Sequence, residues 1–239
     1  MTPPAMRKRA SIALRLLRIL STTCFVAGLA LLAWPLARIL MTASATGEAQ
    51  AEALAAWDHQ TDQSRRAPNG VMVLEIPRLG IRRAVPDGAT VQNLKHYGVG
   101  HISWTAFPPV EHAAVLPGPG RFTGPLSWAA VTGPTAAGRD RGGVVAIAGH
   151  RTTYGAPFFR IGTLHTGDAV MLVYAGRRYV YRVDRQLTTR PSDVEALDGD
   201  ADEIALVTCT PPFSAAFRLI VFGHLERTTA DPGALATGR

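Results

Sequence analysis

Residues 71–224 carry short apolar runs separated by glycine, proline and aspartate. Seven such runs stand out, at 71–76, 80–84, 143–148, 169–174, 178–184, 204–209 and 218–224. Runs of this length bounded by turn residues are typical of β-strands, and Ala175-Gly176 between two of them indicates a tight hairpin. The pattern therefore predicts an all-β domain, either a barrel or a sandwich.

The N-terminal part has a different pattern. Ile19 to Ala37 is a run of 19 uncharged, mostly apolar residues, and a helix of that length is about as long as the hydrocarbon core of a bilayer is thick. We expect a transmembrane signal anchor over residues 19–40. A cleaved signal peptide is the alternative, because residues 43–45 (ASA) match a small-x-small cleavage site, but the run exceeds the roughly 7–15 apolar residues of signal peptides.

Charge predicts the orientation of this helix and argues against one class of partner. Five of the 25 basic residues lie in residues 1–18, which hold no acidic residue, so we expect this basic segment in the cytoplasm and the rest of the chain outside. The other 20 basic residues nearly balance 18 acidic ones, so the net charge of +7 does not indicate a nucleic-acid-binding face. The chain is predicted to be a single-pass protein of the cell membrane, with an extracellular linker at 41–69, a folded domain at 70–226 and a tail at 227–239.

Two stretches between the predicted strands do not fit β-structure. Residues 107–142 hold four clusters of glycine or proline, and loops of this length are usually functional or mobile. Residues 193–203 contain six acidic residues in eleven positions, so calcium binding is an alternative there. The residue order of an EF-hand is missing, however, and a solvated acidic loop explains the composition as well. The histidines lack the spacing of a zinc site, and we expect no metal and no cofactor.

Three residues at the ends of predicted strands could carry chemistry. Cys209 ends one run, Arg218 begins the next, and His150 follows the run at 143–148. If the runs at 204–209 and 218–224 pair as an antiparallel hairpin, Cys209 and Arg218 lie on one sheet edge, about 5 Å apart. A thiolate can attack a carbonyl, an imidazole can protonate a leaving amine, and a guanidinium can stabilise an oxyanion. Taken singly, each residue also has an ordinary structural explanation, but together they indicate acyl transfer through a thioester.

Three segments, in this order along the chain, strongly resemble sortases, in particular class E sortases of high-GC Gram-positive bacteria. They are 149–158 (GHRTTYGAPF), 206–209 (LVTC) and 218–221 (RLIV). The resemblance covers roughly residues 70–226 and implies an eight-stranded β-barrel in which His150, Cys209 and Arg218 are catalytic and Thr208 helps to bind substrate. The chain departs from the family pattern in the insertion at 107–142 and in Thr210, which stands where relatives commonly have histidine.

The resemblance also implies a membrane-anchored cysteine transpeptidase. Such an enzyme cleaves an LAxTG or LPxTG sorting signal between Thr and Gly and joins the Thr carbonyl to an amine of a peptidoglycan precursor or a pilin. The expected partners are surface proteins bearing C-terminal sorting signals, the acceptor amine and the membrane, with no nucleic acid. Two alternatives remain: a catalytically inert, membrane-tethered β-domain that binds cell-wall polymers or proteins, and an L,D-transpeptidase-like enzyme, whose Ser-x-Gly-Cys context is absent around Cys209.

Overall fold

The computed structural model describes residues 4–60, 71–109 and 143–231. Most of the insertion predicted at 107–142, part of the linker and most of the tail therefore lie outside the described residues. By its contacts the chain divides into two units, Met1–Met41 and Thr42–Arg239. The predicted domain boundaries stay predictions.

One long helix, α1 (Pro4–Asp58), contains the predicted membrane span. It is the one helix in the described ranges that is long and apolar enough to cross a bilayer. Large apolar side chains such as Phe25, Leu31 and Trp34 are exposed along it, as expected of a surface that contacts lipid. The same helix continues past residue 41 into the stretch that the sequence predicts as a linker.

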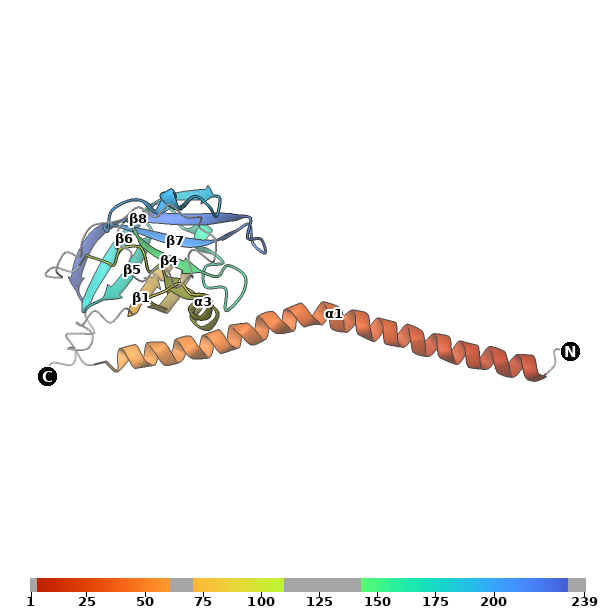
Figure 1. The fold of residues 1–239 in the computed structure, drawn as a ribbon. Helices are drawn as coiled ribbons and strands as arrows, with labels where there is room; N and C mark the ends of the chain where they lie inside the picture. The colour runs from red at the N-terminus through yellow and green to blue at the C-terminus, as the bar shows by residue number, and fades with distance from the viewer. Residues whose placement is uncertain (1–3, 61–70, 110–142, 232–239) are drawn as a thin grey trace. The chain divides into compact units, whose positions relative to one another are not determined.

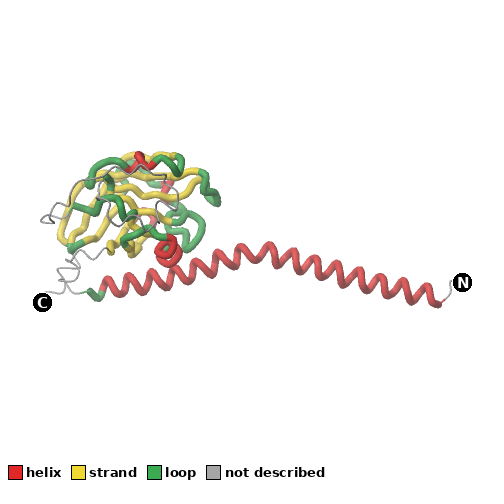
Figure 2. The backbone as a smooth tube through the Cα atoms, in the orientation of Figure 1, coloured by secondary structure: helices red, strands yellow, loops and turns green. Residues whose placement is uncertain are grey.

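The second unit is an eight-stranded sheet that curls into a barrel (Figures 1 and 2). Its strands are β1 (Val71–Ile76), β2 (Ile81–Pro86), β3 (Val99–His101), β4 (Val145–Gly149), β5 (Ala169–Tyr174), β6 (Arg177–Thr189), β7 (Glu203–Thr210) and β8 (Phe217–Ala230). They are arranged in the order β2-β1-β5-β6-β8-β7-β4-β3, with β4 and β7 parallel and every other neighbouring pair antiparallel. The predicted eight-stranded barrel is confirmed.

The two edges of the sheet meet at a single point. Asp87, just after β2, forms an isolated parallel bridge with His101 in β3. The His101 side chain is completely buried, with Nδ1 lying 2.9 Å from the Asp87 carboxylate and Nε2 lying 2.9 Å from the Ala106 carbonyl oxygen. The edges are therefore joined by this bridge, by the Gly88 N–H bond to the His101 carbonyl at 3.0 Å and by the contact of the His101 ring with Asp87.

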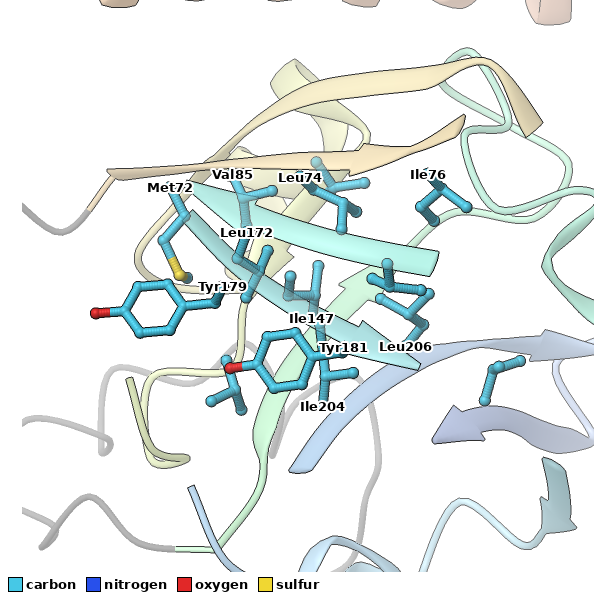
Figure 3. Packing of buried hydrophobic residues seen from close by; sticks show 14 of the residues in the cluster. Met72, Leu74, Ile76, Val85, Ile147, Leu172, Tyr179, Tyr181, Ile204 and Leu206 are labelled. Carbon is cyan, nitrogen blue, oxygen red and sulfur yellow. The ribbon is translucent and has the colours of Figure 1, made fainter. Parts of the chain in front are cut away.

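Alternation along the strands divides the buried side chains into two clusters. Inside the barrel, Leu74, Leu172, Ile147 and Leu206 pack together with two buried tyrosines (Figure 3). The opposite faces of β4, β7 and β8 pack against Leu94 of α3 (Val91–Tyr97) and Leu197 of the 3-10 helix η4 (Val194–Leu197). Because successive strand residues point to opposite faces, this division also fixes the face on which each strand-end residue lies.

Two connections between strands are well defined: the turn between β5 and β6, and the residues on either side of the insertion. Ala175 and Gly176 between β5 and β6 both have positive φ, of 49° and 73°, which confirms the predicted hairpin. At the insertion, the Ala106 backbone N–H donates to the Val144 carbonyl at 3.2 Å. The Phe107 ring stacks on Tyr174 at a centroid distance of 5.0 Å. The residues that border the insertion are therefore held side by side.

Candidate functional site

Cys209 and Arg218 face each other across β7 and β8. They are direct partners in the antiparallel register, which confirms the predicted pairing, and partners of this kind carry their side chains on the same face with Cβ atoms about 5 Å apart. Cys209 is half-buried and Arg218 is 4% exposed. The Arg218 guanidinium donates to the carbonyls of Ala215 and Phe217 at 3.1 Å, so the end of the loop and the first residue of β8 hold it in place.

His150 reaches the same rim from the other side of β7. Strand β4 runs parallel to β7 with Ala148 opposite Val207, so the residues that follow, His150 and Cys209, both lie at the carboxyl ends of their strands. The backbone N–H of His150 donates to the Gly98 carbonyl at 3.0 Å. The His150 carbonyl accepts a hydrogen bond from the backbone N–H of Phe158 at 3.1 Å. The three residues predicted as catalytic therefore come from three adjacent strands, with the cysteine in the middle.

The sequence around His150 explains how its backbone is fixed. A larger residue does not fit at position 149, because a Cβ there would lie 2.5 Å from the ring of Phe158. The glycine lets that ring pack directly beneath the strand end. The imidazole itself has Nδ1 3.3 Å from the Thr153 hydroxyl and lies 4.8 Å from the ring of Tyr154, centroid to centroid.

Burial changes the charge state of this histidine. Desolvation lowers the pKa of His150 from 6.5 to about 4, because burial removes water that stabilises the charged imidazolium more than the neutral ring. At pH 7 the ring is therefore neutral in nearly every molecule. A neutral imidazole can accept the proton of a thiol and can then pass it on.

Thr208 lies inside the sheet, beside the catalytic candidates. It is completely buried, and its hydroxyl donates to the Gly149 carbonyl at 2.7 Å. This bond joins β7 to β4 one residue before both Cys209 and His150. The substrate-binding role expected for Thr208 stays a prediction, while the contact seen in the structure is to backbone.

Arg151 is a site residue that the sequence argument did not single out. Its guanidinium donates from Nη1 to the carbonyl of Cys209 at 3.1 Å. Its Nε is buried without a hydrogen-bond partner among the described residues. Position 151, next to His150 within the motif at 149–158, was the available signal, but the target of the bond is a backbone atom that no pattern indicates.

A cavity of about 500 Å³ borders the His150 loop. It is lined by residues 79–83 of η1 (Pro77–Leu79) and β2, and by the loop residues 155–157, 159 and 160. Cys209 is not among the lining residues, so this cavity is separate from the thiol. Within the residues that the structure describes, no group of three His, Cys, Asp or Glu side chains is placed to hold a metal ion.

Residues 123–226 match the Sortase domain family. Two Streptomyces coelicolor proteins are similar: Sortase SrtE1 is 34% identical over 111 residues, covering 41% of this chain and 32% of the relative, and Sortase SrtE2 is 32% identical over 124 residues, covering 48% and 47%. The chain thus matches less than half the length of these curated relatives.

Solved structures show the same fold. The crystal structure of Sortase E1 from Streptomyces coelicolor, with a tripeptide in its active site, superposes with a TM-score of 0.52 at 27% identity, covering 70% of this chain and 96% of that one. A Clostridium perfringens Sortase D5 transpeptidase superposes with a TM-score of 0.53 at 21% identity, covering 76% and 98%. The second likeness is evidence of fold alone.

Proposed function

We propose that this chain, whose residues 123–226 match the Sortase domain family and which is similar to class E sortases, is a membrane-anchored cysteine transpeptidase. The observation that carries the proposal is the placement of His150, Cys209 and Arg218 on three adjacent strands at one rim of the barrel. Helix α1, with its exposed apolar side chains, supports the membrane anchor. The basic residues before it support a cytoplasmic N-terminus and an extracellular domain.

The substrate is a surface protein with an LAxTG or LPxTG sorting signal. The Cys209 sulfur attacks the carbonyl carbon of the Thr–Gly bond, and the neutral His150 ring takes up the thiol proton. Arg218 stabilises the oxyanion that develops, because its guanidinium is always charged and is held by the carbonyls of Ala215 and Phe217. His150 then returns the proton to the departing Gly amine, which leaves a thioester between Thr and Cys209.

The second half-reaction transfers the acyl group. An amine of a peptidoglycan precursor or pilin attacks the thioester carbonyl and gives its proton to His150. The bond between the carbonyl carbon and the Cys209 sulfur breaks as the new amide forms, and His150 returns the proton to the sulfur. Each step uses only the three side chains and the two substrates, so the proposed chemistry calls for no metal and no cofactor.

Trapping the thioester tests the proposal. The full chain in detergent micelles is incubated with a Leu-Ala-x-Thr-Gly peptide and examined by intact mass spectrometry. We expect an added mass equal to the peptide up to Thr, located on Cys209, and no addition to the matched Cys209→Ala variant. Adding candidate amines should then release the acyl group as an amide. A chain that forms no adduct with either LAxTG or LPxTG peptides would instead fit the inert, membrane-tethered binding domain.

A further inference from the structure

The end of α1 is built into the barrel domain through a buried amide. Gln50 is 1% exposed, and its Nε2 donates to the Ala84 carbonyl at 2.9 Å while its Oε1 accepts from the Ala84 N–H at 2.9 Å. Ala84 belongs to β2, which lies at one end of the strand order. The side chain therefore bonds both backbone groups of an edge residue, as a neighbouring strand would.

The same amide reaches the segment that carries His150. Gln50 Nε2 also donates to the carbonyl of Tyr97, the last residue of α3, at 2.7 Å. The next residue, Gly98, accepts the hydrogen bond from the His150 N–H. The carbonyl that Gln50 binds and the carbonyl that binds the His150 backbone therefore belong to consecutive residues, Tyr97 and Gly98.

Thr46, one helical turn before Gln50, touches the same corner. It is 3% exposed, and its hydroxyl donates to the Lys95 carbonyl at 3.3 Å. Its methyl carbon lies 3.3 Å from where a Cβ of Gly98 would be and 3.7 Å from where a Cβ of Gly155 would be. The methyl group therefore fills the space between the end of α3 and the loop that follows His150.

We propose that Gln50 and Thr46 are positioning residues for His150, so that the end of helix α1 is part of the support of the active site. Gln50 holds the corner at Tyr97 and Gly98 to which the histidine backbone is bonded. The Thr46 methyl holds the loop at Gly155 against that corner. The catalytic meaning of this support rests on the proposed function, but the support itself concerns the placement of one imidazole and can be measured without turnover.

An NMR titration of the histidines measures that placement directly. The full chain, labelled in its histidine rings, is studied in detergent micelles, and the His150 resonance is assigned with a His150→Gln variant. We expect a wild-type midpoint near the pKa of about 4 that burial gives His150. Gln50→Ala should raise it by about one unit, because a loosened loop admits water to the ring.

Matched variants separate positioning from general damage. Gln50→Glu keeps the shape but cannot donate to the two carbonyls, whereas Glu52→Gln makes the reverse exchange at an exposed position of the same helix. We expect a raised His150 midpoint in the first and a wild-type midpoint in the second. Thr46→Ser, which loses the methyl group, should also raise the midpoint, while Thr46→Val, which keeps a methyl, should not. If Gln50→Ala fails to fold, the milder Thr46 pair carries the test.

Kinetics then connect the placement to the reaction. If the chain is active on a sorting-signal peptide, Gln50→Ala should lower kcat about tenfold or more with KM changed less than about twofold, since a small misplacement of a catalytic group costs rate. Val170→Ala, a change in the barrel interior away from α1, is the control of similar stability loss and should keep its kcat. A wild-type chain without any activity refutes the proposed function, yet the titration still decides whether α1 positions His150.

Unchanged His150 midpoints in Gln50→Ala, Gln50→Glu and Thr46→Ser would overturn the inference. So would a Val170→Ala control that shifts the midpoint and lowers kcat as much as Gln50→Ala. The first result would make the end of α1 a passive attachment, and the second would mean that any loss of stability disturbs the site.

Discussion

Burial of His150 should make the folded domain lose stability in mild acid. The pKa of His150 is about 4 in the folded chain and 6.5 as the ordinary value, so the unfolded chain binds more protons between these two pH values. Stability is then fully present above pH 6.5 and falls as the pH drops toward 4. The difference of about 2.5 pKa units corresponds to about 3 kcal/mol, and partial contact of the ring with water reduces this to about 2–3 kcal/mol.

Comparison with a residue that does not titrate isolates this contribution. Urea unfolding of the wild-type chain and of His150→Gln, followed by near-ultraviolet circular dichroism at pH 7 and pH 4.5, gives the two pH dependences. We expect the wild type to lose about 2 kcal/mol more than the variant over this interval, because the other titrating groups are common to both chains. Parallel stability curves would refute the reasoning, since they would mean that the folded imidazole titrates near its ordinary pKa.

Two further predictions concern the neighbours of the cysteine. Arg218→Lys should lower the rate of thioester formation about 10²–10³-fold, because a point charge cannot reproduce the planar guanidinium fork at a developing oxyanion; intact mass spectrometry at timed intervals measures this rate, and near-normal turnover would contradict the role of Arg218. Thr208→Val should cost about 1–3 kcal/mol in urea unfolding, because it leaves the buried carbonyl of Gly149 without its donor. A raised KM with unchanged stability would instead mean that the Thr208 hydroxyl contacts substrate.

The strands that the sequence predicts are those with local signals. The run at 169–174 matches β5 and the run at 71–76 matches β1, because each has the right length and is bounded by turn residues. Strand β3 has only three residues and no alternation, and it exists because it pairs with β4 and meets Asp87. Helix α3 is only seven residues long, so its Thr90 N-cap and Gly98 C-cap are visible in the sequence but predict little by themselves.

In the candidate site, too, some features could be predicted from the sequence and others could not. The facing of Cys209 and Arg218 follows from two strands joined by a short connection, which a sequence can show. The contacts of Gln50, Arg151 and Thr208 could not be predicted, because all three bond backbone carbonyls far away in the chain. A carbonyl is present at every residue, so only the fold determines which one lies within reach.

The contacts that hold the two ends of the insertion together affect how this protein can be engineered. Ala106 and Val144 are hydrogen-bonded to each other, and Phe107 is stacked on Tyr174. The entropy cost of closing a loop between two fixed points grows only slowly with its length, by roughly 0.6 kcal/mol for each doubling. Residues 110–142 could therefore be replaced by a short turn, a foreign peptide or a reporter module. We expect the barrel to keep its strand register after such a replacement.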